Sequence, residues 1–150
     1  YRKSTTRKEG RRGARLEDGQ KDNPAGWPGT EPLEPHGSAG DPDWMGLEWT
    51  TPRPLDPAAA GGIAPGAGLY LLLDCASNEV VLIGQAADLP ARLVQHAGKP
   101  WDGRPLCFSY QIIGQFVLPH HLRELECDLL GDFFRQYRRA PAFQFRPAGQ

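Results

Sequence analysis

The sequence lacks the features that mark secreted, membrane-spanning and zinc-stabilised proteins. Its 150 residues include only three cysteines, Cys75, Cys107 and Cys127, too widely spaced for a zinc ribbon or a disulfide framework. No apolar run approaches the roughly 20 residues that span a bilayer. The basic N-terminus leads into polar sequence, unlike a signal peptide. We therefore expect free thiols, no membrane partner and a cytoplasmic protein.

A strong excess of charge of one sign is lacking too. The formal net charge is −1, and residues 66–150 carry eight basic and eight acidic side chains. The basic residues are instead concentrated in residues 1–15, with seven against one acid. This run would attract nucleic acid nonspecifically, or would simply be solvated.

Glycine and proline are concentrated in the first part of the chain. More than half of the 18 glycines and 15 prolines fall within residues 1–65. Because such sequence buries too little apolar surface to offset its conformational entropy, we expect residues 1–43 to be a disordered tail. Residues 44–65 are predicted to be an aromatic anchor, or a short strand from Trp44 to Trp49, followed by a linker rich in proline, alanine and glycine.

Residues 66–147 have the pattern of one small folded domain. Two apolar runs joined by a polar turn predict a hairpin, and periodic apolar residues predict two helices. The expected fold is α+β, with a small central antiparallel sheet of about three strands flanked by helices in the order β-β-α-β-α. The predicted elements are strands at 68–74 and 80–84, a helix from Asp88 to about Gly98, a strand at 106–112, a helix from Pro119 to about Arg139 and an extended segment at 143–145.

Three side chains in the first half of this domain are candidates for chemistry. Arg92 and His96 are four residues apart on one helix face, while Leu89 and Leu93 lie on a neighbouring face that can dock on the core. The alternative is a solvated Arg–His pair. Tyr70 lies on the first predicted strand, where core or rim packing is the alternative to a functional role.

Glu126 is the most unusual acid in the sequence. It lies on the long predicted helix within an apolar stripe that includes Leu122, Leu129 and Phe133. A purely structural helix avoids an acid there unless it has a partner or binds a metal. Glu124 faces away from Glu126, so the two cannot form a paired carboxylate site.

These residues occur in motifs whose order resembles that of the GIY-YIG nuclease family. The similarity covers about residues 66–145 and depends on several motifs together. The motifs are Gly68-Leu69-Tyr70, then Leu82-Ile83-Gly84-Gln85, Asp88-Leu89 with Arg92-Leu93 and His96, Glu126-Cys127-Asp128-Leu129-Leu130, and Pro141-Ala142-Phe143-Gln144.

The resemblance implies a metal-dependent endonuclease that hydrolyses phosphodiester bonds in DNA, including branched or damaged DNA. By position, Tyr70 would activate the attacking water or relay its proton, and Arg92 would hold the scissile phosphate. His96 would carry a proton or contact the phosphate. Glu126 would bind one divalent metal, Mg²⁺ or Mn²⁺. The implied substrate-binding residues are Gly84, Gln85, Arg92 and Gln144.

Two positions depart from the family pattern. Leu82 replaces the second motif tyrosine, and a leucine cannot hydrogen-bond to water or to metal ligands. Tyr110, on the third predicted strand, is the candidate to replace that tyrosine. Gln144 stands where the family has asparagine. The alternative function is therefore a catalytically inactive domain that binds nucleic acid or a protein partner.

Overall fold

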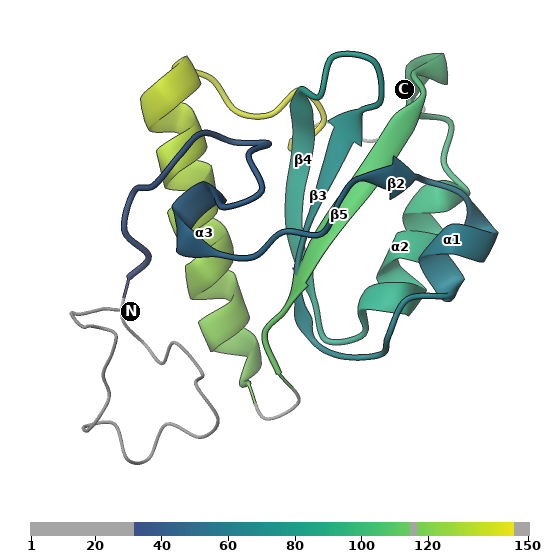
Figure 1. Ribbon diagram of the computed structural model, residues 1–150, viewed down its shortest axis with the longest axis horizontal. Helices are drawn as coiled ribbons and strands as arrows, with labels where there is room; N and C mark the ends of the chain where they lie inside the picture. Colours follow the sequence, from purple (N-terminus) through teal and green to yellow (C-terminus); the bar gives the residue numbers. More distant parts are fainter. Residues whose placement is uncertain (1–31, 115–116, 146–150) are drawn as a thin grey trace. The chain divides into compact units, whose positions relative to one another are not determined.

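The computed structural model describes residues 32–114 and 117–145, within a unit that extends from Pro32 to Gln150. The predicted tail at residues 1–31 lies outside the described residues. The fold is α+β, as predicted (Figure 1). Its elements are η2 (Trp44–Gly46), β2 (Arg53–Pro54), α1 (Pro57–Gly61), β3 (Gly68–Asp74), β4 (Val80–Ala86), α2 (Leu89–Ala97), η3 (Trp101–Gly103), β5 (Leu106–Ile112) and α3 (Pro119–Tyr137).

The sheet is antiparallel, with the strand order β2-β5-β3-β4. Three of these strands were predicted, and the two-residue β2 is the fourth. In the register, Tyr70 of β3 pairs with Tyr110 of β5 on one side and with Gly84 of β4 on the other. These three residues therefore share one face of the sheet.

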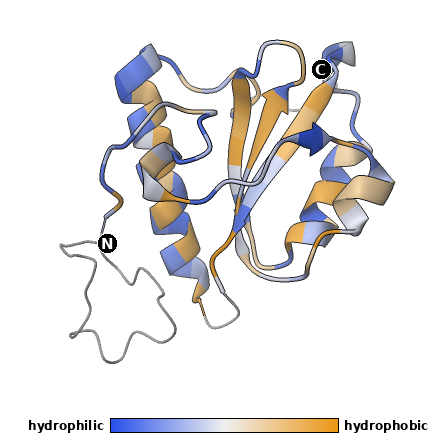
Figure 2. Ribbon diagram, viewed as in Figure 1, coloured by the Kyte–Doolittle hydropathy of each residue, from blue (hydrophilic) through white to orange (hydrophobic). Residues whose placement is uncertain are grey.

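Helices cover both faces of the sheet. Figure 1 shows α1 and α2 on one side and α3 on the other. On the side of α1 and α2, the core includes Leu72, Leu89, Leu93 and Phe108, all fully buried. Figure 2 shows β3 and β4 as apolar over most of their length, as expected for strands with both faces buried.

Residues at the two ends of α2 determine where this helix begins and ends, and both ends lie where the sequence predicted them. Asp88 is the N-cap, and its side chain accepts a hydrogen bond from the backbone of Ala91 at 3.2 Å. Pro90 lies in the first turn, and Gly98 follows the last helical residue. Among the described residues, no helix is both long and apolar enough to cross a membrane.

The predicted linker contains regular structure. The strand β2 pairs with β5, and α1 contacts α2. The helix forms because Asp56 caps it, accepting a hydrogen bond from Ala59 at 2.8 Å, and because Pro57 and three alanines follow.

Residues 32–43 are also not the disordered sequence that we predicted. The backbone N–H of Leu33 donates a hydrogen bond to the Asp128 carboxylate at 3.0 Å, and the side-chain amide of Gln136 donates one to the carbonyl of Gly37 at 3.0 Å. Polar contacts with α3 thus hold a segment that has few apolar residues of its own.

Two other short segments differ from their predicted conformation. Trp44–Gly46 forms a 3₁₀ turn rather than a strand, and Trp44 is fully buried. Its indole nitrogen donates to the buried carboxylate of Asp132 at 2.8 Å, so the segment anchors on α3. Residues 143–145 form a turn instead of an extended segment.

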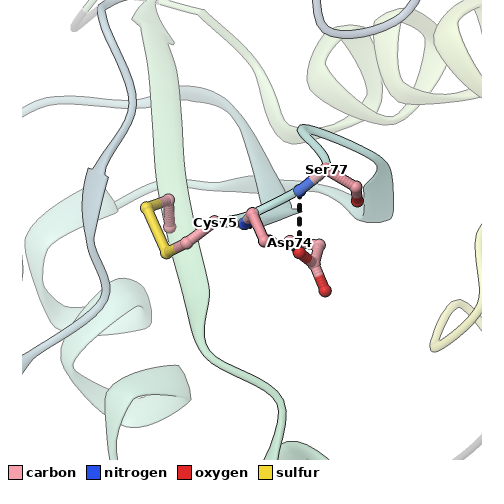
Figure 3. The surroundings of a disulfide bond; sticks show 5 residues. Asp74, Cys75 and Ser77 are labelled. Atoms are coloured by element: carbon pink, nitrogen blue, oxygen red, sulfur yellow. Dashed lines mark hydrogen bonds between the residues drawn. A yellow bond between two sulfur atoms is a disulfide. The ribbon is translucent and has the colours of Figure 1, made fainter.

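The prediction of three free thiols was wrong. Cys75 and Cys107 form a disulfide (Figure 3). Cys127 is free and exposed. Cys107 on β5 pairs with Leu73 near the end of β3, and this register brings its Cα atom within 5.2 Å of that of Cys75. The long separation in sequence gave no sign of this proximity. Figure 3 also shows the adjacent turn, in which Asp74 accepts a hydrogen bond from the backbone of Ser77 at 3.0 Å.

Candidate active site

The Tyr70 ring reaches the outer strand of the sheet because its neighbour there is a glycine. Gly84 lies on β4, the edge strand, directly opposite Tyr70. A Cβ atom added to Gly84 would overlap the Tyr70 ring, with the Cε2 atom at 2.8 Å. The ring therefore lies against the backbone of β4, and its hydroxyl group is carried to this edge of the sheet.

The Tyr70 hydroxyl is hydrogen-bonded to His96. The Oη and Nε2 atoms are 2.8 Å apart, and both side chains are buried. Burial raises the pKa of Tyr70, and the nearby Arg92 guanidinium opposes this rise. Burial, aided by the positive charges of Lys99 and Arg92, lowers the pKa of His96 to about 4. Both groups are consequently neutral at pH 7.

Arg92 is the common neighbour of the other three predicted catalytic residues. It lies on α2 one turn before His96, with an exposed side chain whose Nη1 donates to the Gln85 carbonyl at 3.4 Å. Its positive charge acts on the pKa of Tyr70, of His96 and of Glu126. The guanidinium group of Arg92 therefore places positive charge near all three of these side chains.

Glu126 approaches from α3, which packs mainly against β4 in the sheet. Its side chain is half-buried, and burial raises the pKa of its carboxyl group, while Arg92 opposes the rise. The Glu126 charge in turn acts to raise the pKa of Tyr70. The structure thus brings together Tyr70 of β3, Arg92 and His96 of α2, and Glu126 of α3.

The Glu126 carboxylate fits the metal that the resemblance implies. Among the described residues, it accepts no hydrogen bond and forms no ion pair, so its oxygens are free to bind a cation. The described residues contain no group of three or more His, Cys, Asp or Glu side chains arranged for a metal. Mg²⁺ does not need such a group, because it is often held by one or two carboxylates and keeps several of its waters.

The other predicted substrate-binding residues have structural roles at the same edge. Gly84 makes room for the Tyr70 ring, and the carbonyl of Gln85 accepts the Arg92 hydrogen bond. The Gln144 amide makes two hydrogen bonds of 2.8 Å with the backbone of Ile83, donating to its carbonyl and accepting from its N–H. A substrate contact by Gln144 would have to replace these bonds.

Leu82 and Tyr110 lie on opposite sides of β3. Leu82 is half-buried and packs against the core on the face of α1 and α2. Tyr110 neighbours Tyr70 on the sheet, but it comes from β5, across β3 from Gly84. Tyr110 is therefore close to Tyr70 without occupying the position of the missing tyrosine.

Trp101 contacts the site in a way that the sequence did not indicate. The Trp101 side chain is 4% exposed and is therefore packed within the domain. Its indole nitrogen donates to the backbone carbonyl of His96 at 2.7 Å. Trp101 follows His96 by five residues in the sequence. This spacing matches neither helical nor strand periodicity, so the sequence alone did not indicate the contact.

Comparison of the chain with protein-family models, curated proteins and solved structures finds no match. The resemblance to the GIY-YIG nuclease family therefore rests on the sequence motifs. Function has to be inferred from the chemistry of the site itself.

Proposed function

We propose that this protein is a metal-dependent endonuclease that hydrolyses phosphodiester bonds in DNA, including branched or damaged DNA. The supporting observation is the convergence of Tyr70, Arg92, His96 and Glu126 from three elements at the outer edge of β4. Phosphodiester hydrolysis requires activation of water, positive charge on the phosphate and a carboxylate for a metal, and this cluster supplies all three.

Tyr70 and His96 would move the proton of the attacking water. Tyrosine, with an ordinary pKa near 10, is a poor base when it acts alone. A neutral His96 that carries its proton on Nδ1 accepts the Tyr70 hydrogen at Nε2, across the observed 2.8 Å contact. As the water oxygen attacks phosphorus, Tyr70 takes the water proton and passes its own to His96. The P–O bond to the leaving oxygen breaks, and that oxygen is protonated from solvent.

Arg92 and Glu126 would hold the phosphate and the metal. The exposed guanidinium of Arg92 can bind phosphate oxygens and stabilise the charge that develops on them. Glu126 would hold Mg²⁺ or Mn²⁺, which when bound supplies a Lewis acid for the phosphate. Because Arg92 lies close to Glu126, it opposes cation binding in the free protein, and the negative substrate removes this opposition.

Cleavage of supercoiled plasmid and of branched DNA with Mg²⁺ or Mn²⁺ tests the proposal. Arg92→Ala and Glu126→Gln should each slow cleavage by at least about 100-fold, because Arg92 would stabilise the charge that develops on the phosphate and Glu126 would hold the metal. Glu124→Gln is the matched control, since Glu124 is an exposed carboxylate two residues away on α3. Cleavage that survives both site substitutions in folded variants would contradict the assignment.

Leu82 favours a second candidate function, a catalytically inactive domain that binds nucleic acid or a protein partner. The side chain packs against the core and brings no polar group to the cluster. If this alternative is correct, the folded wild type binds DNA but cuts none of the substrates with either metal. Its binding should then depend on Arg92 and weaken with salt.

The cytoplasmic location stays a prediction. We based it on the expectation of free thiols, and Cys75 and Cys107 are paired. Because disulfides are more common in oxidising compartments than in the cytosol, the cysteines give no argument for the cytoplasm.

A further inference from the structure

Trp101 encloses the imidazole of His96. The two ring centroids are 5.4 Å apart with an interplanar angle of 58°, and the Trp101 indole nitrogen also donates to the His96 carbonyl at 2.7 Å. Phe143 packs edge-on against Trp101, with its centroid at 5.2 Å. His96 is only 6% exposed, although it lies in the last turn of α2 and the nearby charged residues Arg92 and Lys99 are exposed. The aromatic rings therefore keep water away from this side chain.

The backbone at Trp101 has an unusual conformation. Trp101, Asp102 and Gly103 have φ angles of 50°, 53° and 77°, all in the left-handed region. This conformation suits Gly103, but it is an outlier for a residue as bulky as tryptophan. Such conformations persist where surrounding contacts determine them, and they are concentrated at functional sites. At Trp101, the contacts that accompany this conformation are those of its side chain with His96 and Phe143.

His96 needs such support because its side chain has only one hydrogen bond. The Nε2 atom is paired with Tyr70, while Nδ1 is buried without a hydrogen-bond partner among the described residues. An imidazole held at a single atom can rotate or change its tautomer unless its ring is packed. The charged groups that act on it are Arg92 and Lys99, both positive, and the ammonium of Lys99 lies 5.8 Å from the centroid of the Trp101 ring.

We propose that Trp101 is a positioning residue that fixes the His96 imidazole against the Tyr70 hydroxyl and excludes water from it. Its role in hydrolysis rests on the proposed function. The enclosure of His96 does not, and it can be measured without a substrate. In this arrangement the imidazole is kept neutral, with Nε2 directed at the group from which it accepts a proton.

NMR of ¹⁵N-labelled histidine tests the proposal directly, with His96→Gln to assign the His96 signals. In the wild type, His96 should stay neutral down to about pH 4 and should populate one tautomer. In Trp101→Leu, its pKa should rise by at least about one pH unit toward the ordinary 6.5, and both tautomers should appear. Trp101→Phe keeps an aromatic ring but loses the indole donor. This variant should give a smaller rise in the pKa of His96, and it replaces Trp101→Leu in the test if the leucine variant does not fold.

Trp49→Phe is a matched control. Trp49 is also buried, and its indole nitrogen also donates to a carbonyl five residues earlier, that of Trp44, at 3.0 Å. Trp49 lies in the segment anchored on α3, so its substitution should leave the His96 signals unchanged. An unchanged His96 pKa and tautomer in the folded Trp101 variants, or an equal change in Trp49→Phe, would overturn the positioning role.

The pH dependence of cleavage connects this role to the reaction. If the pKa of His96 rises to about 6 in Trp101→Leu, only about a quarter of the imidazole is neutral at pH 5.5, and cleavage should be about fourfold slower there than at pH 8. This additional pH dependence should be absent from the wild type and from Trp49→Phe. If the wild type does not cleave DNA at all, the proposed function fails, while the NMR result still decides the enclosure of His96.

Discussion

Substitution of Gly84 by alanine should displace Tyr70 and destabilise the domain. The new methyl group would meet the Tyr70 ring, with Cε2 at 2.8 Å, whereas favourable contacts between carbon atoms lie at about 3.5–4.0 Å. Tyr70 is 3% exposed and cannot move outward freely. Overpacking of this kind costs about 1–3 kcal/mol, against a gain of about 0.5–1 kcal/mol from the lower backbone freedom of alanine. We expect a net loss of about 1–2 kcal/mol.

Urea unfolding measures this loss. With an m-value of about 2 kcal/mol/M, the midpoint should fall by about 0.5–1 M. Gly131→Ala is the control, because a Cβ atom at Gly131 meets nothing within 4 Å and the residue is exposed on α3. It should stabilise the protein by up to about 1 kcal/mol, since alanine favours a helix over glycine. Equal midpoints for Gly84→Ala and wild type, with the Tyr70–His96 hydrogen bond intact, would refute the packing described here.

Three further predictions concern stability. Asp132→Ala should cost about 2–3 kcal/mol in urea unfolding, because it leaves the buried Trp44 indole N–H without its acceptor; a loss below 0.5 kcal/mol would contradict this. Since the pKa of His96 is about 4 in the folded protein and about 6.5 in an unfolded chain, the unfolded state binds more protons between these values. Stability should therefore be lower at pH 5 than at pH 7.5, by about 2 kcal/mol. Urea unfolding of His96→Gln at both pH values should show this difference reduced. Cys75 and Cys107 are 32 residues apart, and reduction of their disulfide should lower the free energy of unfolding by about 3–4 kcal/mol. Urea unfolding with and without dithiothreitol measures this loss, and coinciding midpoints would contradict the prediction.

The elements of the domain core could be predicted because local sequence determines them. The runs at 68–74 and 106–112 coincide with β3 and β5, and Asp88 with Pro90 marks the start of α2. The same holds for part of the site. The four-residue spacing of Arg92 and His96 fixes their relation on any helix.

The remaining structure depends on contacts between segments far apart in sequence. The segment at 32–43 has too few apolar residues to suggest order, and its hydrogen bonds go to α3 almost 100 residues later. The Cys75–Cys107 disulfide depends on the register of β3 and β5, which no local pattern reveals. The contact of Trp101 with His96 depends on a left-handed turn. Only the short helix α1 had an overlooked local signal, since Asp56-Pro57 followed by alanines is a typical helix start.

The residues after α3 also affect how copies of this chain meet one another. Strand β4 has β3 on only one side, and an unpaired strand edge is a template for association between molecules. Here Phe143 donates a backbone hydrogen bond to the carbonyl of Val81 at 2.9 Å, and the Gln144 amide binds both polar backbone groups of Ile83. These bonds use polar groups that another chain's strand would otherwise pair with. A chain shortened before Pro141 would expose these backbone groups of Val81 and Ile83, so the turn at residues 143–145 protects the sheet from edge-to-edge aggregation.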